Sequence, residues 1–360
     1  MSDFDQEDPA ARAASRRPAT STQVARAAGV SRTTVSFVLN NVLDKGISEA
    51  TRAKVLRVAK ELGYQPNAAA QSLASGSTGT VAMVVPRTEH LYDDQFLAQL
   101  LASVNDECHG LGLKLLIESA QHDDEQASGF VTLVRTRRID GLIMVNPHRA
   151  HIGHLQGLAA ARIPMVVLGS GVPELDTFHT LGQDTRSFSR LAVGHLLDLG
   201  HRDIAYVGFA GRDYFAGAER ELGWRNTLSD AGITPREDLL EFGEITARSG
   251  YHATQRLLAR GVRFTALFAG NDTIAFGAMR ALREVGLRIP EDVALVGYDD
   301  IPLAEFGTPP LTTVHTDPIA HGRVAMLELA RLLGVGGKPV PVLPDPRLVV
   351  RASSGSRLAN

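Results

Sequence analysis

Short apolar runs alternate with amphipathic segments from about residue 80 to residue 300. The apolar runs are too short for helices and predict buried strands at 81–85, 113–117, 141–145, 165–168, 204–207, 266–269 and 293–297. The amphipathic segments predict helices at 95–111, 186–199, 218–231 and 272–285, among others. This alternation is typical of parallel sheets covered by helices on both faces. Because one open sheet does not hold so many residues, we expect an α/β body of two doubly wound parallel-sheet lobes. Ligands of such folds bind at the carboxyl ends of the strands.

The segment 24–40 differs from the body, because its small apolar residues recur at helical spacing. They predict two short helices joined by a tight turn at Gly29. Ser31 is placed to cap the second helix, since its hydroxyl can accept from the amides of the first turn. The polar residues after that cap are Arg32, Thr33 and Thr34. This is the layout of a helix-turn-helix whose second helix enters a DNA major groove, and the alternative is an ordinary helical hairpin.

A third helix and a short hinge follow. Ser48 is the expected N-cap of the third helix, and Gly63 is expected to end it. The apolar face of this helix consists of Val55, Val58, Ala59 and Leu62. Asn67 can cap a further helix at 68–74, which is so short that it is marginal in water without DNA or a second subunit.

Charge is distributed unevenly along the chain. The net charge is −3, yet the segment from 18 to 80 carries seven basic residues against three acidic ones. A small basic head on an acidic body fits a DNA-binding module joined to a domain that does not bind DNA.

Several absences narrow the location and the chemistry. The sequence contains no apolar run near the ~18 residues that a membrane span needs. The acidic N-terminus lacks the pattern of a signal peptide, and the single cysteine, Cys108, cannot form an intramolecular disulfide. We therefore expect a cytoplasmic protein. With no Gly-rich phosphate loop, metal-ligand cluster or Ser-His-Asp arrangement evident, we expect no cofactor, no metal and no enzymatic activity.

Seven motifs, in order along the chain, resemble the lactose repressor family of bacterial transcription regulators (the LacI/GalR type). They are VARAAGVSRTTVS at 24–36, ELGYQPN at 61–67, GHRDIA at 200–205, AGND at 269–272, RIPEDV at 288–293, VGYDD at 296–300 and TPPLTT at 308–313. The resemblance implies a small all-α helix-turn-helix head and a two-lobed body like that of periplasmic sugar-binding proteins. It also implies a repressor that binds operator DNA as a homodimer and is switched by a small-molecule effector between the lobes, with release and promotion of DNA binding both open.

On this basis we expect four parts along the chain. They are a disordered tail at 1–17, a helix-turn-helix domain at 18–66, a hinge helix and linker at 67–79, and an effector-binding and dimerisation domain at 80–355. The chain ends without an apolar heptad segment, which favours a dimer over a tetramer.

The resemblance also assigns residues to DNA. Arg32 and Thr33 become the main base readers, and Thr34 and Ser36 contact phosphate or neighbouring bases. An arginine can bond bidentately to guanine, although a contact to phosphate alone is the alternative for Arg32. Phe37 departs from the family, where arginine is usual, and either touches a thymine methyl group or packs.

The hinge is the second assigned DNA contact. Leu73 corresponds to the leucine that wedges into a base step of the minor groove together with its dimer mate, or it packs against the body. Asn67 and Ala70 face the same groove in this resemblance. The expected operator is near-palindromic, because the protein that reads it is a dimer.

The best-supported effector contacts are Arg220, Asn271 and Asp299. An arginine fork with an amide and a carboxylate suits a ligand rich in hydroxyls or carbonyls, such as a sugar or a sugar derivative. Asp272 is expected to cap the following helix.

Three positions depart from the sugar- and purine-responsive members. Ile245 and Leu97 stand where aromatic residues are common, and Gly169 stands where a polar group is frequent. The chain also has extra length at 88–94. The usual stacking platform is therefore missing or comes from an aromatic residue nearby. The candidates are Tyr92, Phe96 and Tyr214, and we include Tyr92, Phe96 and Ile245 among the expected effector contacts.

Two other classes of function fit less well. A secreted sugar receptor would carry a signal peptide and no basic head. An enzyme that uses Asp299 and Asp300 as acid and base is disfavoured, because adjacent residues on one loop rarely face each other at the required separation.

Overall fold

The computed structural model describes residues 19–40, 42, 45–65, 71–72, 75–87, 90–120, 129–169, 179–181 and 184–355. The chain divides into two compact units between Thr78 and Gly79. The expected tail at 1–17 lies outside the described residues, and so do Asn67, Ala70 and Leu73 of the expected hinge.

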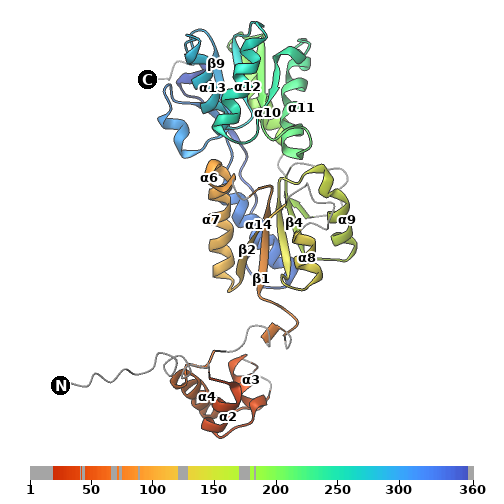
Figure 1. Ribbon diagram of the computed structural model, residues 1–360, viewed down its shortest axis with the longest axis vertical. Coiled ribbons are helices and arrows are strands. Elements are labelled where there is room, and N and C mark those ends of the chain that lie inside the picture. The colour runs from red at the N-terminus through yellow and green to blue at the C-terminus, as the bar shows by residue number, and fades with distance from the viewer. Residues whose placement is uncertain are drawn as a thin grey trace, which may run out of the picture. The chain divides into compact units, whose positions relative to one another are not determined.

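The described part of the first unit contains three helices (Figure 1). They are α2 (Ser21–Ala28), α3 (Arg32–Leu39) and α4 (Glu49–Glu61). Both predicted caps are confirmed, because the amide of Thr34 donates to Ser31 Oγ at 3.0 Å and that of Thr51 donates to Ser48 Oγ at 3.2 Å. Gly29 turns the chain between α2 and α3 with a φ of +67°, a conformation that glycine adopts without steric cost.

These helices share one small core. Its buried members are Val24, Ala25, Ala28, Val35, Val38, Val55, Val58 and Ala59. The prediction that Leu62 belongs to the apolar face is wrong, since its side chain is 43% exposed. Helix α4 ends at Glu61, and Leu62 is its C-cap.

The second unit consists of two lobes, each built on its own sheet (Figure 1). In lobe 1 the strand order is β2-β1-β3-β4-β5, and all pairs are parallel. The strands are β1 (Thr80–Val85), β2 (Lys114–Ser119), β3 (Gly141–Val145), β4 (Met165–Leu168) and β5 (His179–Leu181). One face packs against α7 (Gln95–Gly110) and α14 (Pro318–Leu333), and the other against α8 (Gly129–Arg135) and α9 (Ile152–Ala160). The short α6 (His90–Asp93) precedes α7.

In lobe 2 the strand order is β11-β10-β9-β8-β6-β7. The strands are β6 (Ile204–Gly208), β7 (Leu240–Phe242), β8 (Ala266–Ala269), β9 (Ala294–Asp299), β10 (Thr312–His315) and β11 (Arg347–Val349). One face packs against α12 (Ala247–Ala259) and α13 (Asp272–Glu284), and the other against α10 (Thr185–Asp198) and α11 (Phe215–Asp230).

The predicted strands and helices are present with small shifts at their ends, and the doubly wound architecture is confirmed. Strand β11 departs from the all-parallel expectation, because it pairs with β10 in the antiparallel direction at the edge of its sheet. Helix α14 follows β10 in sequence but packs in lobe 1, so the chain passes between the lobes more than once. Among the described helices, none has the length and apolar character to cross a membrane.

Candidate functional site

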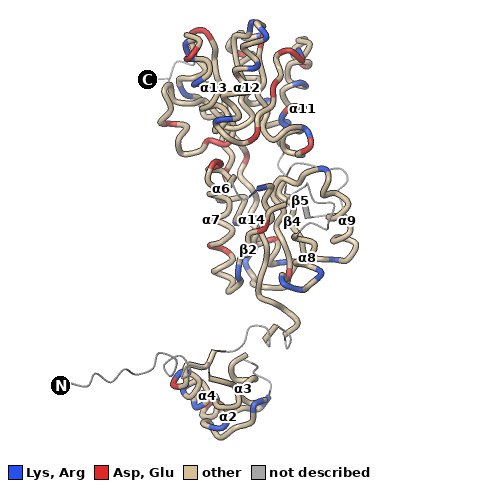
Figure 2. Tube along the Cα trace, in the orientation of Figure 1, with Lys and Arg blue, Asp and Glu red and all other residues tan. Residues whose placement is uncertain are grey.

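The start of α3 presents polar side chains to solvent. Arg32, Thr33 and Ser36 are exposed, and Thr34 and Phe37 are half-buried. The opposite side of α3 is fixed in the core by Val35 and Val38, which are 0% and 3% exposed. The helix is therefore held by its apolar side while the residues expected to read DNA stand outward. Figure 2 marks the positions of further Lys and Arg residues on the helices of this unit.

Phe37 has a cationic neighbour in the first unit. The Nζ atom of Lys45 lies 5.8 Å from the centroid of the Phe37 ring, which is the geometry of a cation–π contact. An apolar ring next to a positive charge can contact a thymine methyl group while the ammonium faces a phosphate. Lys45 thus places a positive charge beside residue 37, where the sequence has phenylalanine in place of arginine.

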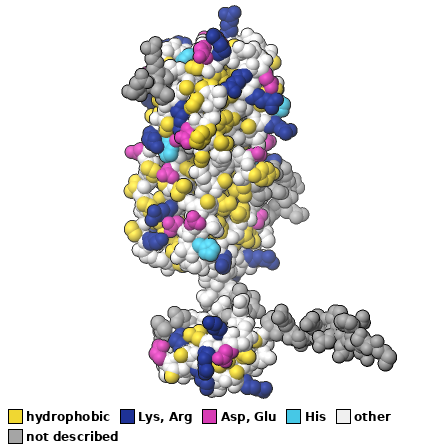
Figure 3. Space-filling view, turned by 90° about the vertical axis from the view of Figure 1, so that its left-hand side faces the viewer, with side chains coloured by type: hydrophobic (Ala, Val, Ile, Leu, Met, Phe, Trp, Pro, Cys, Tyr) yellow, Lys and Arg dark blue, Asp and Glu magenta, His cyan; other side chains and the backbone are white. Residues whose placement is uncertain are grey.

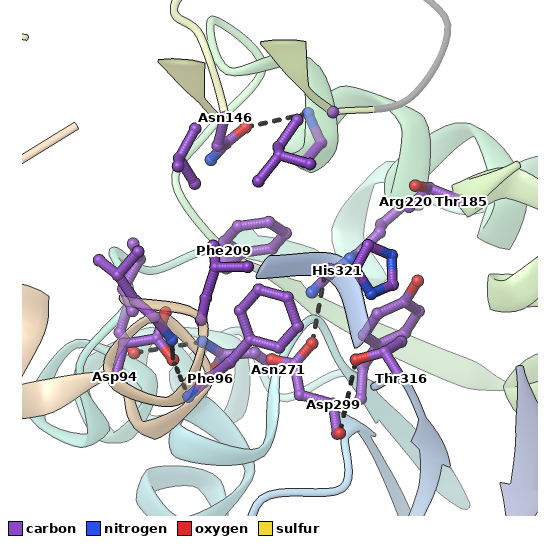
Figure 4. A pocket seen from close by; sticks show the side chains of 18 of the residues that line it. Asp94, Phe96, Asn146, Thr185, Phe209, Arg220, Asn271, Asp299, Thr316 and His321 are labelled. Carbon is purple, nitrogen blue, oxygen red and sulfur yellow. Dashed lines mark hydrogen bonds and ion pairs between the residues drawn. The ribbon is translucent and has the colours of Figure 1, made fainter. Parts of the chain in front are cut away.

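A cavity of about 130 Å³ lies between the two lobes of the second unit (Figure 4). It is lined from lobe 1 by residues at the carboxyl ends of β1, β3 and β4, and from lobe 2 by residues at the corresponding ends of β6, β8 and β9. This is the position at which open parallel sheets bind ligands.

Most of the expected effector contacts line this cavity. Arg220, Asn271 and Asp299 do so from lobe 2, together with Ile245, and Phe96 does so from the start of α7. Leu97 and Gly169, two of the positions that depart from the sugar- and purine-responsive members, line the cavity as well.

Two of the aromatic candidates lie elsewhere. Tyr92, on α6, is 79% exposed and is not part of the cavity wall, so the structure does not support it as a contact. The ring of Tyr214 packs edge-on against His148 at 4.9 Å and does not line the cavity either. The aromatic surface comes instead from Phe96, Phe209 and Tyr298.

Arg220 is the central charged group of the cavity. One of its terminal nitrogens, Nη1, donates to the carbonyl of Gly270, and Nη2 lies 3.5 Å from Asp299 Oδ1. The guanidinium carbon lies 3.6 Å from the ring centroid of Tyr298 and 4.3 Å from that of Phe209. Its Nε atom is buried and has no hydrogen-bond partner among the described residues. A guanidinium has five N–H donors and these two bonds use two of them, so Nε and one hydrogen on each terminal nitrogen are left for a ligand.

The helix cap that the sequence assigns to Asp272 is made by Asn271, which also lines the cavity. Asn271 caps α13, because its Oδ1 accepts from the amide of Ile274 at 2.8 Å. The prediction that Asp272 is the cap is wrong: its carboxylate accepts from Thr313 Oγ1 at 2.6 Å and from the amide of Ile301 at 2.9 Å. The cap uses the oxygen of Asn271, and Nδ2 donates to the carbonyl of Ile245 at 3.4 Å, so the second N–H of Nδ2 is left for a ligand.

The backbone after β9 is held in an uncommon conformation. Asp299 and Asp300 have φ angles of +111° and +56°, a region that non-glycine residues rarely adopt. The side chain of Asp300 is anchored by Arg351 at 2.8 Å and by His315 at 2.9 Å. Such strain persists only where the surroundings enforce it, and here it directs Asp299 into the cavity.

The two lobes are joined by hydrogen bonds beside the cavity. The amide of Arg149 donates to the carbonyl of Asp213 at 2.8 Å, and the amide of Ala216 donates to Asn146 Oδ1 at 3.3 Å. These bonds connect a segment that follows β3 to the start of α11. One side of the cavity is therefore closed by direct contacts between the lobes.

Sequence reasoning missed Asp94, Thr316 and His321, which also line the cavity (Figure 4). Asp94 stands directly before the predicted helix at 95–111, so a search for N-caps could have found it. His321 lies on α14, and its presence here follows only from the return of that helix to lobe 1. Within the described residues, no three His, Cys, Asp or Glu side chains are grouped to hold a metal ion.

Comparison with protein families identifies both units. Residues 22–67 match the family described as bacterial regulatory proteins, lacI family. Residues 193–354 match the periplasmic binding protein-like domain. The two matches cover the helix-turn-helix unit and most of lobe 2.

Relatives match over nearly the whole chain. The HTH-type transcriptional repressor PurR of Edwardsiella ictaluri is 34% identical, over 93% of this chain and 96% of its own. The HTH-type transcriptional regulator CelR of Thermobifida fusca is 36% identical, over 94% of this chain and 99% of its own.

Two solved structures have the same fold. The lac repressor dimer bound to operator and the anti-inducer ONPF matches with a TM-score of 0.78 and 29% identity, over 94% of this chain and 99% of that one. The complex of the transcriptional regulator CelR with cellobiose matches with a TM-score of 0.67 and 34% identity, over 93% of this chain and 99% of that one.

Proposed function

Because the chain belongs to the LacI family of bacterial regulatory proteins, we propose specific roles for its residues in a ligand-controlled transcriptional repressor. Like its relatives, the protein is a DNA-binding transcriptional regulator and not an enzyme. The observation that carries the proposal is the presence, in one chain, of a helix-turn-helix unit with an outward polar helix and of a cavity with a buried charged pair between two lobes.

The operator is read by α3. Arg32 and Thr33 contact base edges in the major groove, and Thr34 and Ser36 contact phosphate or neighbouring bases. A bidentate bond from Arg32 to guanine would contribute ~1–3 kcal/mol of discrimination. Phe37 contacts a thymine methyl group, supported by the position of Lys45 beside its ring.

The hinge contacts the minor groove. Leu73 enters a central base step together with the leucine of a second subunit, and Asn67 and Ala70 face the same groove. An apolar wedge of this kind kinks the duplex, and the added contacts offset the cost of unstacking. The lac repressor neighbour is a dimer on its operator, which supports a homodimer on a near-palindromic site for this chain. A regulator of this kind acts on DNA, so we place the protein in the cytoplasm.

The effector binds between the lobes. Arg220, Asn271 and Asp299 make its polar contacts, and Phe96 and Ile245 its apolar ones. The CelR neighbour was solved with cellobiose, which supports a sugar-type ligand. Binding shifts the population between arrangements of the lobes and thereby changes operator affinity.

Fluorescence anisotropy tests the proposal. The full chain is titrated onto a labelled palindromic duplex from the upstream region of its own gene and onto a scrambled duplex, over a series of salt concentrations. We expect selective, salt-sensitive binding. Arg32→Ala should remove most of the selectivity, whereas Arg190→Ala, an exposed arginine of α10, should not. Equal binding of both duplexes by the unaltered chain would reject the proposal.

A further inference from the structure

A group of cations lies at the edge of lobe 1 where its parallel strands begin. Its members are exposed and stand at the start of β2 or on the segments that lead into β3 and β4: Lys114, Arg135, Arg137, Arg138 and Arg162. Because parallel strands start at the same edge of a sheet, these segments share one end of the lobe. Figure 2 shows Lys and Arg positions gathered at that end, beside α8 and β2. We call these five residues the basic edge.

The cations of the basic edge have no partners in the part of the chain that the structure describes, since none of their side chains makes an ion pair or a hydrogen bond there. In lobe 2, by contrast, most arginines form ion pairs, as Arg225 does with Glu237 and Arg288 does with Asp292. Exposed ion pairs contribute little to stability, so their absence at the basic edge costs the fold little. It leaves the positive charge to an anion from outside.

Acidic residues near the basic edge do not neutralise it. Oδ2 of Asp140 already accepts from a backbone amide at 2.8 Å. Glu107, near the end of α7, pairs with Arg323 at 3.1 Å and with Lys338 at 3.3 Å. Asp106 is exposed about one turn before the end of the same helix. Lobe 1 therefore has a positive end, although the chain as a whole carries a net charge of −3.

The first unit joins lobe 1 at this same edge. The carbonyl of Gly79 accepts from the amide of Lys114 at 2.8 Å, and the carbonyl of Thr80 accepts from the amide of Asp140 at 2.8 Å. Strand β1 therefore begins between β2 and the segment that leads into β3, both of which carry cations of the basic edge. The 65–79 segment, which leads from the helices of the first unit to β1, can span at most about 50 Å. DNA bound to the first unit is thus tethered at the basic edge.

We propose that the basic edge binds phosphate groups of the DNA backbone, without regard to sequence, while the first unit reads the operator. The inference rests on the proposed function, because it needs DNA held by α3. Double-stranded DNA carries about one negative charge per 1.7 Å of its axis, so cations brought against it displace its counterions and gain affinity. DNA is favoured over other polyanions because the chain itself brings DNA to this edge.

Removal of two charges from each lobe provides a matched comparison. Arg137→Gln/Arg138→Gln takes two cations from the basic edge. Arg263→Gln/Arg347→Gln takes two from lobe 2 that are likewise exposed and without ion pairs among the described residues. Arg137→Lys/Arg138→Lys keeps the charge at the basic edge. Each full-length protein is titrated by fluorescence anisotropy onto the operator duplex and the scrambled duplex, at salt concentrations from about 50 to 200 mM.

We expect Arg137→Gln/Arg138→Gln to weaken binding to both duplexes at least ~10-fold at the lowest salt concentration. Each phosphate contact contributes about 0.9 to the slope of log K against log salt, so the loss of two contacts in each subunit of a dimer should reduce that slope by up to about 3.6. The ratio of the two affinities should change less than ~3-fold, because phosphates carry no sequence information. The lysine variant and the lobe 2 variant should keep the slope of the unaltered chain.

Three results would overturn the inference. They are equal slopes for the two glutamine variants, a loss confined to the operator duplex, and a loss in the lysine variant as large as that in Arg137→Gln/Arg138→Gln. Sedimentation with phosphatidylglycerol vesicles is the contrasting assay. Vesicle binding that needs Arg137 and Arg138, together with an unchanged slope on DNA, would assign the basic edge to a membrane surface instead.

The same titrations separate this failure from failure of the proposed function. Selective operator binding by the unaltered chain, together with any of these results, rejects the basic edge alone. Equal binding of both duplexes by the unaltered chain rejects the regulator proposal.

Discussion

The two lobes share one architecture and differ in what they contribute to the cavity. In lobe 2 the polar groups are already joined, since Arg220 contacts Asp299 and the Gly270 carbonyl while Asn271 caps a helix. Lobe 1 contributes mainly apolar side chains together with the unused oxygen of Asp94. Lobe 2 is therefore largely bonded within itself before a ligand arrives, although Arg220 Nε is buried and has no partner among the described residues, whereas lobe 1 offers the second carboxylate oxygen of Asp94. A difference of this kind links occupancy of the cavity to the position of lobe 1.

Removing the arginine of lobe 2 should have the largest effect. Arg220→Ala leaves Asp299 buried without its cation, so we expect a loss of about 3 kcal/mol in the free energy of unfolding. Effector affinity should fall at least ~100-fold, because a charged donor is lost as well. Urea denaturation and calorimetry measure the two effects. Arg256→Ala, an exposed arginine of the same lobe, is the control, and effector affinity within threefold of the unaltered chain would contradict the role of Arg220.

Asp94→Asn should stabilise the ligand-free protein. Burial raises the pKa of Asp94 from 3.8 to about 6, so the folded state favours the protonated carboxyl. The free energy of unfolding therefore falls as the pH rises from about 4 through 6, and asparagine avoids that fall. We expect the variant to be about 2 kcal/mol more stable at pH 7.5, with an advantage that shrinks as the pH approaches 4. If Asp94→Asn and the unaltered chain had the same free energy of unfolding in urea at pH 4 and at pH 7.5, burial of the Asp94 carboxylate would carry no cost.

Effector affinity should depend on pH in the opposite sense. A hydroxyl donates to the ionised carboxylate, so affinity should rise about tenfold between pH 5 and pH 7. Burial also raises the pKa of Asp299 on the other side of the cavity, so protonation of Asp299 at low pH acts in the same direction. Calorimetry across this range, with a reduced slope in Asp94→Asn, checks the prediction. A flat profile in the unaltered chain would contradict it.

The smallest effect belongs to Tyr92. Its side chain is 79% exposed and lies outside the cavity wall, so Tyr92→Ala should change effector affinity less than twofold and stability by less than about 0.5 kcal/mol. Phe96→Ala is the informative partner, because Phe96 lines the cavity four residues further on. A loss in Tyr92→Ala as large as that in Phe96→Ala would show that the extra segment closes over the ligand.

Residues with a clear local pattern were predictable. The apolar runs of β1, β3, β4 and β8 and the caps Ser31 and Ser48 carry their own signals, and the structure shows all of them. The strands β5, β7, β10 and β11 are short and have no uninterrupted apolar run, since their sequences are HTL, LEF, TTVH and RLV, and they exist through their pairing in the sheets.

The residues of the cavity also differ in how far the sequence predicts them. Arg220, Asn271 and Asp299 stand in recognisable motifs at strand ends or helix starts, and all three line it. The burial of Asp94 was not predictable, because it results from lobe 2 lying opposite the start of α7. His321 was not predictable for a related reason, since its helix packs on strands more than 150 residues earlier in the chain.

On the face of the second unit seen in Figure 3, apolar side chains lie among charged ones, whereas the apolar face of α14 is buried. That helix supplies Ala325, Met326, Leu329 and Ala330 to the core of lobe 1, whose strands begin with Thr80. During translation the first lobe to emerge therefore has an incomplete core until lobe 2 as far as β10 and then α14 have left the ribosome, with β11 following last. Lobe 2 has its central strands β6, β8 and β9 in one continuous stretch, so the lobe made second is the one that can form first.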